Sequence, residues 1–325
     1  MKRKLLPVLY LAPVLAVLGL LLSMPSEASE GARSGLALCA GVVVPSLLPF
    51  LILSGLAAAL GLPELLSRAG APLLARLGIP PEAAAPLLLG LTGGYPVGAS
   101  ALAQLVRDGR MSPEAAGDAL PWCNNTGPGF IVGFTGAAVF GSVQAGMMLY
   151  LCHAAAAFAL AFCGRKRRKA GAFPPGNAPD RSLAEALPAC IQTAAISMLT
   201  ICTYVVFFSV LTALLRSAGV LSALAVGLSA RLGLELRSAY ALLNGLLELS
   251  GGIGALRGAA PTPGNAALAA FLLGFGGLSV HCQTLYAVSG TKIKCARHFA
   301  GRIVHGLCSA LLAFGLFSLL TPPQI

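Results

Sequence analysis

The sequence predicts an all-α polytopic membrane protein, and three observations lead to this fold class. The 325 residues are 57% hydrophobic and only 10% charged, whereas an ordinary soluble domain carries about 25% charged residues. Apolar runs of the length needed to cross a bilayer recur along the whole chain. The 39 glycines and 22 prolines are typical of membrane helices that contain breaks.

The net charge of +11 does not indicate a nucleic-acid partner. The basic residues flank apolar spans instead of gathering on one hydrophilic domain, so membrane topology explains them. None of the nine cysteines forms a CxxC pair, and we expect neither a disulfide framework nor a metal site. The chain has no GxSxG, Walker or HExxH motif and no clustered pair of carboxylates, and we therefore expect no enzyme.

The first segment, residues 1–35, is predicted to be a signal-anchor helix followed by an external loop. A basic start precedes the apolar run 5–22, and small residues follow it. This pattern resembles a cleavable signal peptide, but the apolar run is longer than is typical, which favours a retained anchor.

The second segment, residues 36–164, is predicted to be the first of two transmembrane repeats. It begins with an inward span (36–60) and an amphipathic surface helix (63–78). A re-entrant hairpin (84–106, broken at 92–96), an outward span (116–140, broken at 124–129) and a returning span (145–162) follow. The hairpin is predicted because each side of its break holds about ten residues, half the number needed to cross.

A basic linker, residues 165–182, precedes the second transmembrane repeat, residues 183–325. The second repeat has the same elements in the same order, over 187–215, 220–236, 240–256, 265–289 and 299–320. Breaks are expected at 250–252 and around 276–281. The local match is Leu-Thr-Gly-Gly-Tyr at 91–95 against Leu-Ser-Gly-Gly-Ile at 249–253.

The positive-inside rule orients these repeats in opposite directions. Most basic residues then face the cytoplasm, including the cluster Lys292, Lys294, Arg297 and Arg302. Paired broken helices in inverted repeats indicate a transport site near the midplane. Half-helix N-termini have free N–H groups and partial positive charge, so they suit an anion.

Two motifs carry a family resemblance. Gly-Gly-Tyr-Pro-Val-Gly-Ala at 93–99 and Asn-Asn-Thr-Gly-Pro-Gly-Phe at 124–130 resemble signatures of the sporulation integral membrane protein YlbJ (SpoVV) family. These are nucleoside-recognition (Gate) domain proteins, similar in plan to concentrative nucleoside transporters. The resemblance implies that the protein moves dipicolinic acid across the outer forespore membrane during sporulation, from the mother cell.

Two titratable residues inside apolar runs have competing interpretations. Glu248 is predicted to couple transport to a proton or cation or to contact substrate, and the alternative is a hydrogen-bonded packing residue. His281 is either proton-linked or a neutral histidine bonded to a carbonyl group. His153 is predicted to be structural. The coupling ion, H⁺ or Na⁺, stays open.

The remaining candidates lie at the predicted breaks. Asn124, Asn125 and Thr126 are predicted to contact substrate, or to cap half-helices; Thr92 and Ser250 most simply cap the hairpin tips. Tyr95 is predicted to cover an aromatic substrate or to pack. The predicted substrate-binding residues are Thr92, Gly93, Gly94, Tyr95, Asn124, Asn125, Thr126, Gly127, Glu248, Ser250, Gly251, Gly252, Ser279, His281 and Gln283.

The sequence thus favours a transporter of a small aromatic dicarboxylate in the bacterial membrane. The alternatives are transport of a nucleoside or another small polar metabolite, which Glu248 favours because an ionised acid repels a dianion, and a non-transporting scaffold in spore assembly. Its partners would be the substrate and the lipid bilayer, with a homo-oligomer left open.

Overall fold

The computed structural model describes residues 2–62, 65, 71–164 and 182–320. These residues form helices and turns and contain no strand, which confirms the all-α prediction. In chain order the helices are α1 (Lys2–Ser23), α2 (Pro25–Leu38), the π-helical η1 (Cys39–Val43), α3 (Val44–Ala59), α5 (Ala71–Arg76), α6 (Pro81–Gly93), α7 (Val97–Arg107), α8 (Pro113–Cys123), the π-helical η2 (Gly129–Val139), α9 (Val143–Gly164), α10 (Leu183–Ser217), α11 (Val220–Leu232), α12 (Leu236–Leu247), α13 (Leu249–Gly254), α14 (Pro263–Phe275), α15 (Gly277–Ala287) and α16 (Ala296–Leu320).

Five helical segments in the described part of the chain are long and apolar enough to cross a membrane: Pro25–Ala59, Val143–Gly164, Leu183–Ser217, Pro263–Ala287 and Ala296–Leu320. The first and third have 35 residues each, or about 52 Å of helix at 1.5 Å per residue. Because the hydrocarbon core is about 30 Å thick, helices of this length tilt strongly or extend beyond it.

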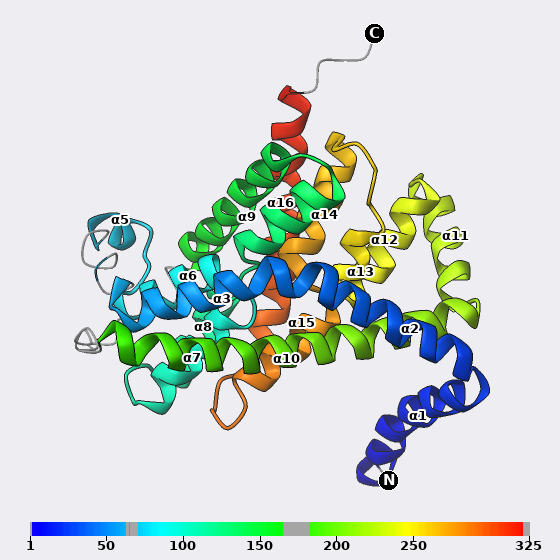
Figure 1. The fold of residues 1–325 in the computed structure, drawn as a ribbon, viewed down its shortest axis with the longest axis horizontal. Helices are drawn as coiled ribbons and strands as arrows, with labels where there is room; N and C mark the ends of the chain where they lie inside the picture. Colours follow the sequence, from blue (N-terminus) through cyan, green and yellow to red (C-terminus); the bar gives the residue numbers. More distant parts are fainter. Residues whose placement is uncertain (1, 63–64, 66–70, 165–181, 321–325) are drawn as a thin grey trace.

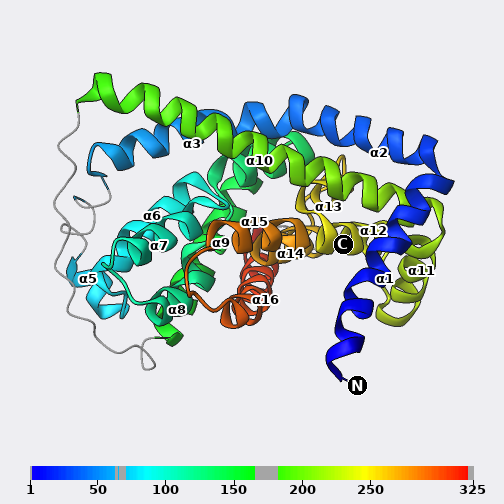
Figure 2. The ribbon, with the colours of Figure 1, turned by 90° about the horizontal axis from the view of Figure 1, so that it is seen from below.

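The two longest segments lie side by side and antiparallel along one edge of the molecule (Figure 2). Gly31 and Gly35 of α2 allow this close approach, since a Cβ atom on either would lie about 3 Å or less from α10 atoms (2.8 Å from Ala213 Cβ and 2.9 Å from Val206 Cα). Small residues four apart are the common means of bringing membrane helices together.

The remaining helices form a central bundle with a broken hairpin on each side. α9, α14 and α16 lie together in the centre, α6–α8 lie on one side and α11–α13 on the other, while α1 projects away (Figure 1). The order of a long helix, a short helix, two interrupted helices and a final helix occurs twice along the chain.

The structure differs from the expected external loop at the end of segment 1–35. Residues 25–38 form α2, which continues without interruption through η1 into α3. Pro25 lies in the first turn of α2, where its missing N–H has no cost. The polar composition predicted a loop, but the glycine contacts with α10 hold the segment as helix.

Two other expectations fall partly outside the described residues. Of the surface helix predicted over 63–78, the structure describes α5 and the residues that follow it. The basic linker 165–182 lies outside the described residues except for Ser182, which caps α10 by accepting a hydrogen bond from the Glu185 backbone N–H (3.3 Å).

Candidate substrate-binding site

The helix interruptions come together around one cavity. Four interruptions follow Gly93, Cys123, Leu247 and Phe275. The cavity measures about 560 Å³, counting the open space at its mouth. Its lining includes polar residues from all four interruptions: Thr92, Tyr95, Thr126, Glu248, Ser250, Ser279 and Gln283.

Glycines allow the first two interruptions to pack closely against each other. Gly94 has φ +79°, and a Cβ atom there would lie 2.9 Å from the Gly127 nitrogen. A Cβ atom on Gly90 or Gly98 would overlap the carbonyl oxygen of Cys123. The hairpin α6–α7 therefore packs against the end of α8 through backbone contacts, and only glycine permits such a close approach.

The interruption between α12 and α13 is built around Glu248. Its backbone is extended (φ −142°, ψ 118°), and its carboxylate caps α13. Oε1 accepts a hydrogen bond from the Ser250 N–H (2.9 Å) and Oε2 accepts one from the Gly251 N–H (2.6 Å). The free N–H groups of this helix terminus are therefore bonded to the protein's own acid.

Hydrogen bonds between the two halves close the other side of the site. The Thr126 hydroxyl donates to the Leu273 carbonyl (2.8 Å), and the Asn124 amide donates to the Thr284 hydroxyl (2.8 Å). The Asn124 side-chain oxygen also accepts from the Ala99 N–H (3.3 Å). Asn124 thus links α7, the first-half interruption and α15.

A fully buried arginine lies behind this wall. Arg302 of α16 is 0% exposed and donates to the carbonyl oxygens of Pro121 (3.2 Å) and Asn124 (2.9 Å) and to the Tyr95 hydroxyl. Its guanidinium carbon lies 5.3 Å from the centre of the Tyr95 ring. The ion pair found among the described residues joins Arg297 to Asp118, and no carboxylate in that part of the chain lies within ion-pair distance of Arg302.

Two histidines connect Arg302 back to the interruption. Nδ1 of His305 lies 2.7 Å from Arg302 Nη1, and its Nε2 lies 3.0 Å from the His153 carbonyl oxygen. Arginine can only donate, so Nδ1 of His305 accepts from it. The carbonyl oxygen can only accept, so Nε2 carries the proton and His305 is neutral. Nε2 of His153 accepts from the Thr126 N–H (3.2 Å). His153 therefore supports the site from behind.

The placement of Arg302 corrects the expectation that it lies with the cytoplasmic basic cluster. In the sequence, Arg302 closely follows Lys292, Lys294 and Arg297, which predicts one basic cluster. In the structure, α16 begins at Ala296 and buries Arg302. The sequence of α16 contains a pattern that indicates this burial. Four polar residues of this helix recur at helical spacing and are buried: His298, Arg302, His305 and Ser309. Such a stripe on an apolar helix indicates a face directed at protein.

Most of the predicted site residues line the cavity, and five do not. The lining includes Thr92, Gly93, Gly94, Tyr95, Thr126, Gly127, Glu248, Ser250, Ser279 and Gln283. Among the five others, Asn124 and Asn125 hold the interruption together, the latter by donating to the Trp122 carbonyl (2.8 Å). His281 packs against Phe275, His298 and Phe299.

Gly251 and Gly252 correct the expected position of the second hairpin's break. The helix is interrupted at Glu248, and Gly251 and Gly252 lie within α13. Helix can resume directly after Glu248 because its side chain caps the new terminus. Glu248, and not Ser250, is therefore the capping residue, and the Thr92 hydroxyl donates back to the Leu88 carbonyl (2.8 Å) without capping.

The same shift affects the local match between the halves. Residues 91–95 end α6, whereas residues 249–253 begin α13. The two Gly-Gly pairs therefore do not occupy equivalent places, since the interruption follows one and precedes the other.

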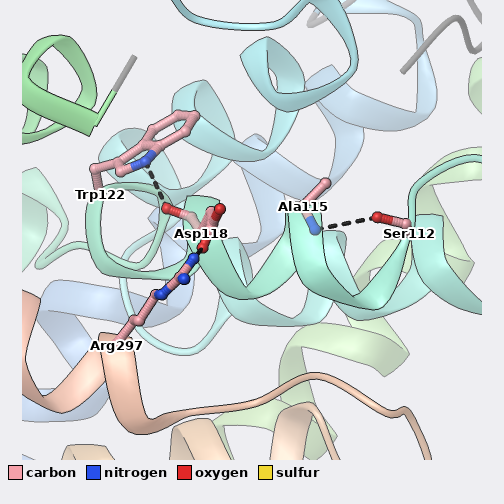
Figure 3. Close-up of polar contacts among 5 residues, drawn as sticks. All are labelled: Ser112, Ala115, Asp118, Trp122 and Arg297. Carbon is pink, nitrogen blue, oxygen red and sulfur yellow. Dashed lines mark hydrogen bonds and ion pairs between the residues drawn. The ribbon is translucent and has the colours of Figure 1, made fainter. Parts of the chain in front are cut away.

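Polar contacts at the start, middle and end of α8 involve residues that do not line the cavity (Figure 3). Ser112 caps α8 by accepting from the Ala115 N–H (3.1 Å), and the Trp122 indole donates to the Asp118 carbonyl (3.0 Å). Asp118 also pairs with Arg297 at the start of α16. Asp118 lies in the middle of α8, and this ion pair links the two halves.

Comparisons with known proteins agree with this arrangement. Residues 40–165 match the family model Gate, described as nucleoside recognition. This part of the chain is therefore similar to Gate domains. The matched range contains the first pair of interruptions and lies almost wholly within the predicted first repeat.

A whole-chain relative supports the same assignment. The chain is 26% identical to the sporulation integral membrane protein YlbJ of Bacillus subtilis (strain 168), over 91% of this chain and 79% of the relative. No solved structure matches. The resemblance stated from the two sequence motifs is confirmed. With its five apolar helices long enough to span a bilayer, the chain is an integral membrane protein similar to a sporulation protein.

Proposed function

We propose that this protein is a transporter, not an enzyme, and that it carries a small anion through the cavity where the interrupted helices meet. The observation that carries the proposal is Arg302. A fully buried cation is costly in a membrane protein, and such residues mark substrate or ion pathways. No carboxylate of the described residues offsets its charge, so an anion in the neighbouring cavity is the natural counter-charge.

Helix termini add to the positive potential. The starts of η2 and α15 contribute Gly129, Phe130, Ser279 and Val280 to the cavity lining. Backbone N–H groups at helix starts favour anions. Glu248 already occupies the start of α13, and the Phe130 and Ile131 N–H groups at the start of η2 donate to the Gly127 carbonyl. We therefore propose the start of α15 as the terminus that meets a substrate carboxylate.

Dipicolinate is the substrate that we propose, because the family resemblance implies it and the cavity fits its chemistry. Its two carboxylates need positive partners, and its flat ring needs an apolar or aromatic surface. Tyr95 and Phe130 line the cavity beside the polar groups. We propose that this transport takes place in the outer forespore membrane, which the similarity to a sporulation integral membrane protein supports. The coupling ion, H⁺ or Na⁺, is left open.

A nucleoside is the second candidate, and two observations favour it. The matching family model is described as nucleoside recognition, and the Glu248 carboxylate on the cavity wall would repel a dianion more than a neutral solute. Its bonds to two N–H groups lessen that repulsion, since the helix terminus partly offsets the charge. A scaffold role in spore assembly predicts that no solute binds.

The repeated order of helices supports alternating access as the transport mechanism. The long segments of the two halves pack against each other, and Thr126 and Asn124 of the first half bond to Leu273 and Thr284 of the second. We propose that the halves are related by inversion, with re-entrant α6–α7 and α12–α13, and that they move about this shared cavity.

Ligand-dependent thermal stability of the purified protein separates these candidates. A ligand present at 100 times its Kd stabilises the folded state by about 2.7 kcal/mol. We expect dipicolinate to raise the unfolding temperature in a concentration-dependent manner, and uridine and benzoate to have smaller effects. Stabilisation by uridine alone would favour the nucleoside, and no stabilisation by any solute would favour the scaffold.

A further inference from the structure

A second cavity lies on the other side of Glu248. It is bounded by one face of α2, one face of α10 and the α12–α13 interruption, and it measures about 730 Å³, counting the open space at its mouth. Its lining is mostly polar: Glu30, Ser34, Ser209, Thr212, Arg216, Asn244 and Glu248, together with Gly31, Leu38, Ala213 and Gly251. α2 and α10 are otherwise parts of apolar membrane-spanning segments.

The polar residues of α10 recur at helical spacing. Ser209, Thr212 and Arg216 lie three and four residues apart, so they share one face of the helix. The hydroxyl groups of Thr193, Thr200 and Thr203 on the same helix donate to the carbonyl groups four residues earlier. Thr203 is exposed among apolar side chains such as Leu199 and Phe207, which indicates the lipid-facing side.

This cavity leads from the surface to a buried acid. Glu30 and Arg216 at one end are exposed, whereas Glu248 at the other is 4% exposed. Between them, the side-chain oxygen Oδ1 of Asn244 is buried and has no hydrogen-bond partner among the described residues.

The Glu248 carboxylate separates this cavity from the proposed substrate site. Its Oε1 accepts from the N–H of Ser250, which lines the substrate cavity, and its Oε2 accepts from the N–H of Gly251, which lines the second cavity. Glu248 itself lines both. One side chain and the helix start that it caps therefore form the partition between two hollows.

We propose that the second cavity is a hydrated vestibule through which a small polar solute reaches the substrate cavity, and that the Glu248–α13 cap closes the passage between them. The vestibule opens at the end of α10 that carries Arg216, opposite the end that follows the basic linker 165–182. The positive-inside rule predicts that the linker lies in the cytoplasm, so this mouth is expected on the outer side. Its role as an entry route rests on the proposed function, whereas its hydration and the closure by Glu248 do not.

Cysteine reactivity toward a cationic, membrane-impermeant thiosulfonate reagent tests the vestibule without any transport assay. In protein lacking the native cysteines, Ser209→Cys and Thr212→Cys should react at least about tenfold faster than the control Thr203→Cys, because the reactive thiolate forms in water. Equal rates at the three positions would overturn the vestibule. If the cysteine-free background folds poorly, the same three variants in wild-type protein report the added site by peptide mass spectrometry.

The partition is tested by a cysteine on the far side of Glu248. Reagent applied from the Arg216 side should modify Ser279→Cys slowly, and Glu248→Ala should raise this rate at least about tenfold by removing the α13 cap. Glu248→Gln, which keeps one acceptor, should give an intermediate rate. Unchanged rates in both variants would refute closure by Glu248.

Transport of dipicolinate is measured separately in the same preparations. Labelling as predicted without dipicolinate uptake would contradict the proposed function and leave the vestibule standing. Uptake with unreactive Ser209→Cys and Thr212→Cys would contradict the vestibule and leave the proposed function standing.

Discussion

Arg302 near the start of the last helix donates a hydrogen bond to the hydroxyl of Tyr95 in the first broken hairpin. The two residues are far apart in sequence, and their contact joins the cationic interior of the second half to the cavity wall of the first. Tyr95 lines the substrate cavity, and Arg302 also holds the Asn124 carbonyl at the next interruption. The charge of Arg302 is therefore placed directly behind the proposed site.

Replacing Arg302 with Gln should reduce dipicolinate uptake by about tenfold or more, since a hydrogen bond to a charged group contributes roughly 1.5–3 kcal/mol and 1.36 kcal/mol is a factor of ten. Arg302→Lys should recover part of the activity, because lysine keeps the charge without the planar fork. The matched control is Arg297→Gln, which removes an exposed arginine of the same helix. Equal uptake in Arg302→Gln and Arg297→Gln would contradict a role for the buried charge.

Replacing Tyr95 with Phe should weaken substrate affinity while the protein stays folded. The change removes the hydroxyl that accepts from Arg302 and leaves that donor without one partner, at a cost of about 1–3 kcal/mol. Thermal unfolding and dipicolinate titration of the same sample report the two effects separately. A variant with wild-type affinity would limit Tyr95 to packing.

Replacing Glu248 with Gln distinguishes coupling from capping. Gln keeps the shape and one acceptor but cannot ionise, so we expect substrate exchange to continue while accumulation driven by a pH gradient is lost. Both are measured in the same vesicles. Full pH-driven uptake by the variant would exclude Glu248 as the coupling group and leave it as a structural cap.

Replacing Gly98 with Ala should prevent stable insertion or folding, because the added Cβ atom would overlap the Cys123 carbonyl oxygen. The control is Gly264→Ala near the start of α14, where a Cβ atom meets nothing within 4 Å. At that site we expect no loss of stability and a gain of up to about 1 kcal/mol. Similar yields and unfolding temperatures for the two variants would contradict the backbone contact between α7 and α8.

Local composition was sufficient to predict the interruptions of the first half. Glycine, proline and asparagine at 93–96 and 124–129 interrupt apolar runs, and the helices end there. The cavity followed from the same reasoning, since broken backbone in a membrane needs polar surroundings. Glu248 was predicted because it is an acid in an apolar run, and it is both buried and part of the cavity lining.

Other features depend on tertiary contacts that local composition does not report. The loop expected before residue 36 is helical because Gly31 and Gly35 pack on α10. Arg302 was assigned to a surface cluster because its neighbours in sequence are basic, and its burial depends on carbonyl groups of Pro121 and Asn124, far away in the chain. The second hairpin breaks at Glu248 because a side chain, not a glycine, caps the next helix.

Uptake of radiolabelled dipicolinate by proteoliposomes tests the central claim most directly. The comparison needs wild-type protein, Arg302→Gln, Arg297→Gln and empty vesicles, with excess unlabelled dipicolinate or uridine as competitor. We expect saturable uptake by wild type and Arg297→Gln, competition by dipicolinate but not uridine, and near-background uptake by Arg302→Gln. Wild-type vesicles that take up no more dipicolinate than empty ones, at both imposed pH and Na⁺ gradients, would contradict it.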